Sequence, residues 1–499
     1  MRPFKTICVT LLFFSLFHSF TTEAQNSNEV RDRMQERYRN YKSATRQKYD
    51  SYRDQLNQKY CEWLKNAWCD MDGNKAIPIP DEKDDLIPPK VAPEEDRKPR
   101  SNPICVPIDT IIPLPEPDEE PVPTFPIIEQ ATPIHHYMEV NFYGSECRIR
   151  FDINNIRFLN DISEASLIAM WEHLYANCDN MLYDLLQIRK DMYLCDWAYL
   201  KLCESLAAQI YPARNNEQMY LQAYILIQSG FDILFGRDDY ENLHILLATN
   251  SIMYEKSYWT IEENEYYCLS DYSGDRLNIM PFSFPQNVPL RLDILQENRF
   301  EEHKSQPRHL SGEHYPISAT VQTNINLMDF YNDYPASYAN HDGTTKWRFY
   351  ANTPLASTTQ ESLYPSITQA IKGKSEIEAV QMILNFVQTA FEYEYDDVIW
   401  GQDRVFFADE SLYYPYCDCE DRSILFSRLI RDILHLDVVL VFYPGHLYTA
   451  VAFNSEPGGD YITIEGKRYT ICDPTYIPAA IGCTMPGMDN NNAIAIKLN

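Results

Sequence analysis

Three residues in the C-terminal part of the sequence carry side chains that suit nucleophilic chemistry. Cys419 stands at the start of a predicted helix, His446 at the head of a predicted strand, and Asp473 at the end of a later strand. A cysteine attacks as its thiolate, and an unperturbed pKa of about 8.5 keeps most of the thiol protonated at neutral pH. A helix N-terminus and a neighbouring imidazolium both favour the thiolate, so these positions predict an activated cysteine.

Together the three side chains predict a catalytic triad. His446 is expected to accept the thiol proton and later return it to a leaving amine. Asp473 is expected to bind the other imidazole nitrogen, which fixes the tautomer and orientation of the ring. The amide of Cys419 is expected to donate to the oxyanion, because the first amides of a helix have no partners inside that helix.

The sequence around these residues resembles a known family. DCEDRS at 418–423, GHLYTAVAF at 445–453 and ICDPTY at 471–476 are similar to three blocks of the transglutaminase-like superfamily. The resemblance covers roughly residues 365–485. It implies a papain-like core, in which the cysteine begins a helix that packs on an antiparallel sheet carrying the histidine and the aspartate. It also implies a second oxyanion donor upstream, between Tyr395 and Gln402.

Two neighbouring cysteines compete for the role of nucleophile. Cys419 is followed by Glu420 and Asp421, as in the family block, whereas Cys417 is followed by Asp-Cys. We therefore assign the nucleophile to Cys419. Cys417 departs from the family pattern, and it is a spectator, a disulfide partner of a distant cysteine such as Cys472, or a redox guard on its neighbour.

Helices and strands of an α+β domain must position these residues. Apolar residues at helical spacing predict one helix from Glu376 and a second from Cys419. The segments VVLVFYP, LYTAVAF, YITIEG and KRYTIC read as strands. Aromatic residues before the nucleophile either line a cleft or pack in the core, and they are Trp400, Phe406, Phe407, Tyr413, Tyr414 and Tyr416.

The N-terminal part of the sequence predicts three further segments. Residues 1–24 read as a secretory signal peptide, with basic residues before a short apolar core. Residues 25–75 predict a long amphipathic helix, whose aromatic stripe either packs on the protein's own body or binds a protein partner. Residues 76–130 contain fourteen of the 31 prolines among many acidic residues and predict an extended linker.

The middle of the sequence carries no motif that we can tie to chemistry. Residues 131–240 predict a hairpin followed by helices, and residues 241–360 predict a β-rich region. Within the latter, ISATVQTNINLMDF and KWRFYA read as strands. Residues 361–499 then form the predicted catalytic domain, so the chain as a whole is expected to be α+β.

Composition limits the function. The formal net charge of −29 argues against nucleic acid as a partner, and no segment after the predicted signal is apolar enough to span a membrane. The sequence contains no DxDxDG loop and no pair of CxxC motifs, so we expect no metal and no cofactor.

We interpret the protein as a secreted or periplasmic cysteine enzyme that acts on amide bonds of a protein or peptide through a thioester. Hydrolysis, as in a peptidase or amidase, is favoured by analogy with exported relatives of the fold. The alternatives are a transglutaminase, which transfers the acyl group to an amine, and a non-catalytic scaffold that retains the fold. No residue pattern decides between hydrolysis and transfer.

Overall fold

The computed structural model describes residues 27–79, 87–115, 120–123, 127, 129, 136–272, 274–338, 345–487 and 493–499. The predicted signal peptide lies outside these residues. The chain divides into two compact units, Met1–Cys61 and Glu62–Asn499. Among the helices of the described residues, none is long and apolar enough to cross a membrane.

A single helix, α1, extends from Ser27 to Asn66. It forms where the sequence predicts it, because no glycine or proline interrupts this stretch. The predicted end at residue 75 is wrong, since Cys69–Asp72 forms strand β1. Tyr41 and Tyr52 of the predicted stripe are exposed.

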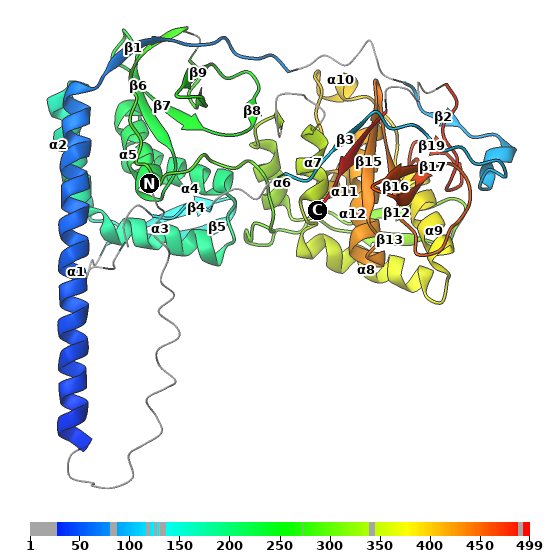
Figure 1. Ribbon diagram of the computed structural model, residues 1–499, viewed down its shortest axis with the longest axis horizontal. Coiled ribbons are helices and arrows are strands. Elements are labelled where there is room, and N and C mark those ends of the chain that lie inside the picture. The colour runs from blue at the N-terminus through cyan, green and yellow to red at the C-terminus, as the bar shows by residue number, and fades with distance from the viewer. Residues whose placement is uncertain are drawn as a thin grey trace. The chain divides into compact units, whose positions relative to one another are not determined.

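The middle of the chain contains helices and an antiparallel sheet (Figure 1). The sheet has the order β1-β11-β6-β7-β10-β9. Its further strands are β6 (Ile233–Arg237), β7 (Leu243–Ala248), β9 (Tyr258–Ile261), β10 (Asn264–Cys268) and β11 (Arg276–Met280). The predicted hairpin is formed by β4 (Tyr137–Phe142) and β5 (Ser145–Arg150), and the helices are α2 (Glu164–Asn177), α3 (Asp179–Asp191), α4 (Asp196–Ile210) and α5 (Asn215–Gln228). Helix α5 packs on β6 and β7.

One predicted strand between residues 241 and 360, and the second half of another, are helices. The sequence INLMDF lies in α6 (Ile325–Asn332) and KWRFYA lies in α7 (Lys346–Asn352). Tertiary packing explains α7, because it lies against α12 and its Trp347 ring is 4.8 Å from the ring of Phe442. The remaining elements of this region are β8 (Ile252–Met253), β12 (Arg308–Ser311), β13 (Ser318–Val321), β14 (Ser337–Tyr338) and α8 (Ser357–Ile371).

The C-terminal part contains a six-stranded sheet with the order β17-β18-β16-β15-β20-β3. Its strands are β3 (Thr110–Ile112), β15 (Val438–Tyr443), β16 (His446–Val451), β17 (Tyr461–Ile464), β18 (Lys467–Cys472) and β20 (Ile494–Lys497). The helices are α9 (Glu376–Thr389), α10 (Asp396–Ile399), α11 (Ala408–Tyr413) and α12 (Cys419–Leu434). Helix α12 packs along β15 and β16 (Figure 1). The predicted helices and strands of this region are therefore present, and they form an α+β arrangement.

The proline-rich segment is not a free linker where the structure describes it. Strand β2 (Lys90–Val91) pairs with β19 (Tyr476–Ile477), and β3 pairs with β20, both in parallel. Amides between the prolines make the contacts, since Ala92 N and Val106 N donate to the carbonyl oxygens of Ile477 and Tyr461. The prediction of a linker over 76–130 failed because prolines remove only their own amides, and the residues between them still pair.

A buried carboxylate joins this segment to the C-terminal sheet. Asp460 is completely buried and accepts hydrogen bonds from Arg100 Nη1 at 2.9 Å, Ile104 N at 3.1 Å and Thr484 N at 3.1 Å. Arg100 also binds Asp96. A buried carboxylate that loses one of its charged partners is costly, so this contact should matter for stability.

We predict that Arg100→Met lowers the free energy of unfolding by about 2 kcal/mol, less than for a fully buried pair because the arginine is partly exposed. The control is Lys304→Met, which removes an exposed ion pair with Glu302 and should change stability by less than about 0.5 kcal/mol. Urea unfolding measures both. Equal effects of the two substitutions on the free energy of unfolding would show that the contact between residues 87–115 and Asp460 does not stabilise the fold.

Candidate active site

Cys419 is the first residue of α12, as predicted. The start of the helix is held by Asp421, whose carboxylate accepts hydrogen bonds from Asp418 N at 3.3 Å and Phe406 N at 2.9 Å. The side chain of Cys419 is 3% exposed. The helix therefore presents the thiol and its first amides at a buried end, where a developing negative charge would be stabilised.

His446 and Asp473 form a buried pair between two neighbouring strands. His446 begins β16, Asp473 follows β18, and the two strands are paired in the sheet. His446 Nε2 lies 3.0 Å from Asp473 Oδ2. Because a carboxylate can only accept, Nε2 carries the proton in the neutral ring, and Nδ1 then has a free lone pair.

The carboxylate of Asp473 is held on both oxygens. Its Oδ1 accepts hydrogen bonds from Thr475 N at 2.9 Å, Thr475 Oγ1 at 2.8 Å and Tyr476 N at 3.2 Å. Burial raises the pKa of Asp473, but His446 and the hydrogen bonds from Thr475 outweigh it and lower the pKa overall. Asp473 is thus ionised and can orient the imidazole.

The thiol of Cys419 lies beside the strand that carries His446. The amide of Leu447, the residue after His446, faces the sulfur and favours its thiolate. One turn along α12, Ser423 Oγ donates to the carbonyl of Leu447 at 2.9 Å. His446 Nδ1 is buried and, within the part of the chain that the structure describes, has no hydrogen-bond partner. The structure therefore brings His446 and Asp473 together and places the Cys419 thiol beside the residue that follows His446. Among the described residues, no hydrogen bond joins the thiol to the imidazole.

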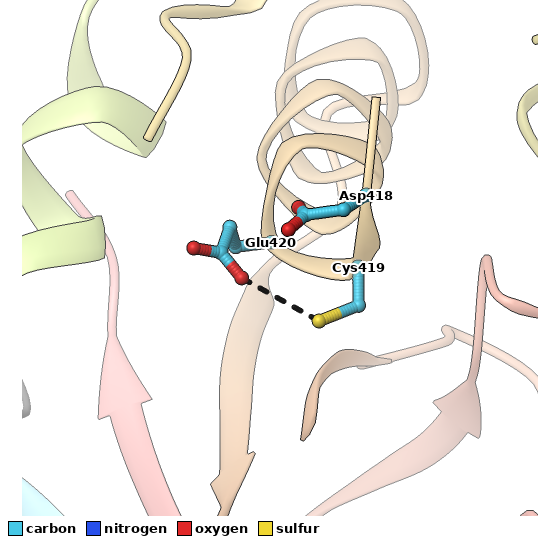
Figure 2. A group of neighbouring side chains, drawn as sticks. All are labelled: Asp418, Cys419 and Glu420. Atoms are coloured by element: carbon cyan, nitrogen blue, oxygen red, sulfur yellow. Dashed lines mark hydrogen bonds between the residues drawn. The ribbon is translucent and has the colours of Figure 1, made fainter. Parts of the chain in front are cut away.

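Two carboxylates flank the thiol (Figure 2). Cys419 Sγ donates to Glu420 Oε2 at 3.5 Å. Asp418 is the residue that precedes Cys419 in the sequence. Burial, then the charges of Asp418 and Glu420, raise the pKa of Cys419 well above its usual value. This differs from the expectation of an activated thiolate, since the helix N-terminus is outweighed by burial and these two neighbours.

More acidic groups gather next to Glu420. Carboxylate oxygens of Asp396, Asp403 and Glu420 all lie within 4.8 Å of one another, as do donor atoms of Asp418, Cys419 and Glu420. Burial and the charge of Glu420 raise the pKa of Asp396 to about 8. Lys346 Nζ, 2.7 Å from Asp403 Oδ2, balances part of the negative charge. Such oxygen donors suit a hard divalent cation such as Ca²⁺, a property that the sequence motifs did not indicate.

Two buried side chains that sequence reasoning missed connect the parts of the site. Arg422, a residue of the DCEDRS block, donates to the carbonyls of Gln388 at 3.0 Å and Phe391 at 2.9 Å. Gln388 Nε2 in turn donates to the carbonyls of Asp473 and Tyr476, both at 3.0 Å. Hydrogen bonds thus join helix α12, the end of α9 and the loop after β18. A lone glutamine in a helix carries no sequence signal for such a role.

The environment of Cys417 differs from that of Cys419. The amide of Cys417 donates to the carbonyl of Glu392 at 3.2 Å. Burial raises the pKa of its thiol, while the guanidinium groups of Arg422 and Arg308 oppose that shift. Both cysteines are free thiols. Cys419, unlike Cys417, is influenced by the amide of Leu447 on β16. The geometry therefore favours Cys419 over Cys417 as the partner of His446.

A cavity of about 370 Å³ lies next to the acidic groups. Asp403, Lys346, Arg404 and Phe407 are among its lining residues. Of the aromatic residues that we expected either in a cleft or in the core, Phe407 lines this cavity. Others form a packed cluster, in which the ring of Trp400 is 5.0 Å from that of Tyr414. Cys419, His446 and Asp473 are not among the residues that line this cavity, so the choice between a substrate cleft and the core stays open for these aromatic residues.

Comparisons with family models, with curated proteins and with solved structures found no match for this chain.

We predict that Glu420→Gln speeds alkylation of Cys419 by iodoacetamide near pH 7. The carboxylate raises the thiol pKa, so removing its charge lowers that pKa and increases the thiolate fraction at a given pH. The control is Glu392→Gln, an exposed carboxylate on the neighbouring segment. Mass spectrometry of the labelled peptide measures the rate. An unchanged pH profile in Glu420→Gln would show that this carboxylate does not control the thiol.

The expectation of metal independence stays a prediction, and the acidic groups show where it can be tested. We expect wild-type Cys419 to be alkylated at the same rate after dialysis against EDTA and after addition of Ca²⁺. A rate that falls with the chelator and returns with Ca²⁺ would instead assign the carboxylates of Asp396, Asp403 and Glu420 to a bound metal.

Proposed function

We propose that residues 361–499 form a transglutaminase-like catalytic domain, and that the protein is a cysteine enzyme acting on amide bonds through a thioester on Cys419. The observation that carries the proposal is the state of His446. Its Nε2 is bound to Asp473, while its Nδ1 is buried without a partner among the described residues, one residue away from the amide that faces the thiol. A buried acceptor without a hydrogen bond costs free energy. A role in accepting the thiol proton would explain why Nδ1 is left without a partner.

The proposed reaction begins with attack of Cys419 Sγ on the carbonyl carbon of the substrate. The S–H proton passes to His446 Nδ1, the carbon–sulfur bond forms, and the carbonyl electron pair moves onto oxygen. The amide of Cys419 at the start of α12 donates to that oxyanion. Collapse of the intermediate breaks the carbon–nitrogen bond, and His446 returns the proton to the leaving amine, which leaves a thioester.

The raised pKa of Cys419 determines how the first step occurs. A preformed thiolate would be a minor species at neutral pH, because burial, Asp418 and Glu420 all favour the thiol. Proton transfer to His446 therefore accompanies attack, as in general-base catalysis, rather than preceding it. Asp473, which is ionised, stabilises the imidazolium that forms.

Water or an amine then releases the acyl group. We propose hydrolysis of a protein or peptide amide, with the protein secreted or periplasmic, as the predicted signal peptide indicates. Transfer to an amine, as in a transglutaminase, uses the same thioester and remains the alternative within the enzyme class.

A second candidate function is a non-catalytic scaffold that retains this fold. The observation that favours it is the protonated, carboxylate-flanked thiol, which makes no hydrogen bond to His446 in the described structure. A scaffold needs no reactive thiol, so the two proposals differ in whether Cys419 can be acylated.

We predict that p-nitrophenyl acetate acetylates Cys419 and that water then releases acetate. Intact-mass measurement should show one added acetyl group in wild type and in Cys417→Ser, and none in Cys419→Ser. Addition of methylamine during turnover distinguishes the two chemistries, because a transferase forms N-methylacetamide faster than it forms acetate. No acetylation in wild type, or acetylation that depends on Cys417, would favour the scaffold.

A further inference from the structure

Three side chains in the middle of the chain form a hydrogen-bonded series outside the site of Cys419. His244 Nδ1 lies 2.7 Å from Ser270 Oγ, and His244 Nε2 lies 3.3 Å from Asp238 Oδ2. A hydroxyl, an imidazole and a carboxylate in this order are the groups that activate a serine as a nucleophile. No sequence motif indicated this group, because strand pairing rather than a characteristic spacing brings its members together.

The strand order β6-β7-β10 places the three residues at one end of the antiparallel sheet. Asp238 directly follows β6, His244 is the second residue of β7, and Ser270 comes two residues after the end of β10. Strand β7 is antiparallel to both neighbours, so the end of β6, the start of β7 and the end of β10 meet. Leu269 N donates to the carbonyl of Ile245 at 3.1 Å, which places residue 270 opposite residue 244.

The carboxylate of Asp238 is held on both oxygens. Its Oδ1 accepts hydrogen bonds from Tyr240 N at 2.9 Å and Asn242 N at 2.8 Å, and its Oδ2 accepts from Asn242 Nδ2 at 2.9 Å. Burial raises the pKa of Asp238, but the hydrogen bonds from Asn242, His244 and Tyr240 outweigh it and lower the pKa overall. Asp238 is therefore ionised and accepts the Nε2 proton of His244.

His244 is a neutral base that is already bound to the hydroxyl. Burial lowers the pKa of His244, and Asp238 opposes that shift without cancelling it. With the proton on Nε2, the lone pair of Nδ1 accepts the O–H of Ser270. The thiol of Cys419 makes no such hydrogen bond to His446 among the described residues. The middle sheet thus contains the nucleophile–base contact that the first site lacks.

Ser270 is the member of the group that a substrate can reach. Its side chain is half-buried, and it lines a cavity of about 580 Å³. His244 and Asp238 are not among the residues that line this cavity, and their side chains are 8% and 6% exposed. The base and the carboxylate are therefore shielded from water, while the hydroxyl faces open space.

Lys256 places positive charge on the same cavity. Its Nζ donates to the carbonyl of Leu269, the residue before Ser270, at 3.4 Å and to Asp271 Oδ1 at 3.0 Å. The side chain of Asp271 is fully exposed, so this ion pair is weak. The ammonium group can instead bind a negatively charged oxygen that forms next to Ser270.

We propose that Ser270, His244 and Asp238 form a second nucleophilic site that hydrolyses small carboxylic esters. Ser270 Oγ attacks the carbonyl carbon, its proton passes to His244 Nδ1, and the carbonyl electron pair moves onto oxygen. The carbon–oxygen bond to the alcohol then breaks, and His244 returns the proton to the leaving alcohol. Water, deprotonated by His244, releases the acid from Ser270. The inference does not depend on any reaction of Cys419.

The first test treats the full chain with diisopropyl fluorophosphate. Attack by Ser270 Oγ forms a phosphorus–oxygen bond and breaks the phosphorus–fluorine bond, and the serine proton passes to His244. Peptide mass spectrometry should find the phosphoryl group on Ser270 in wild type and in Cys419→Ser alike. Asp238→Asn should slow this labelling at least about 100-fold, because an amide does not fix the required tautomer of the imidazole.

Ser318 is the matched control within the same chain. Its Oγ lies 3.3 Å from His309 Nε2, but both side chains are exposed, and in the described part of the chain no carboxylate binds His309. A serine next to a histidine without the buried carboxylate should not be activated. We therefore expect no phosphoryl group on Ser318.

The second test measures release of p-nitrophenol from p-nitrophenyl acetate. Cys419→Ser should release it continuously and without a stable acetyl group, because His244 also activates the water that removes the acyl group from Ser270. The double variant Cys419→Ser/Ser270→Ala should release it no faster than buffer alone.

Four results would overturn the inference. They are wild type without label on Ser270, equal labelling of Ser270 and Ser318, an unchanged labelling rate in Asp238→Asn with a native circular dichroism spectrum, and no turnover by Cys419→Ser. If Asp238→Asn does not fold, the comparison of Ser270 with Ser318 in wild type still decides. Failure of the proposed function gives a different pattern, in which Cys419 is not acylated while Ser270 is labelled.

Discussion

The hydrogen bond between His446 Nε2 and Asp473 Oδ2 is the interaction on which the rest of the site depends. It fixes the proton on Nε2 and so leaves the lone pair of Nδ1 free to accept a proton. The pairing of β16 with β18 brings the two residues together, and Thr475 holds the second oxygen of the carboxylate. Gln388 holds the loop that carries Asp473. Strands β16 and β18 and the loop after β18 thus hold the imidazole of His446 in place.

Opposing electrostatic effects determine the pKa of the Cys419 thiol. The N-terminus of α12 and the amide of Leu447 favour a thiolate, but burial and the carboxylates of Asp418 and Glu420 oppose it more strongly. A protonated thiol next to a base is compatible with catalysis if the proton leaves during attack. The carboxylate of Glu420 also lies within 4.8 Å of that of Asp403, which lines the cavity.

The sequence predicted the parts of this region in which local patterns agree with the tertiary structure. The helix at Cys419 and the strands before His446 and Asp473 have regular apolar spacing, and each lies where the pattern placed it. Residues 346–352 were misread because their pattern of large apolar residues suits a strand as well as a buried helix. Residues 87–115 and Gln388 bind residues that are distant in the sequence, such as Ile477 and Asp473. A local sequence pattern cannot reveal such contacts. The raised pKa of Cys419 also required the structure. The sequence shows that Glu420 follows Cys419, but not that its carboxylate lies 3.5 Å from the sulfur.

The pH dependence of Cys419 alkylation by iodoacetamide, in wild type and in His446→Ala, tests the central claim most directly. In the proposed mechanism, His446 removes the proton of an otherwise unreactive thiol. It predicts that wild type is alkylated below pH 8 at least about 100-fold faster than His446→Ala, and that the two rates converge at high pH as the thiol ionises without help. Equal rates in the two proteins across this range, or labelling of Cys417 in place of Cys419, would contradict it.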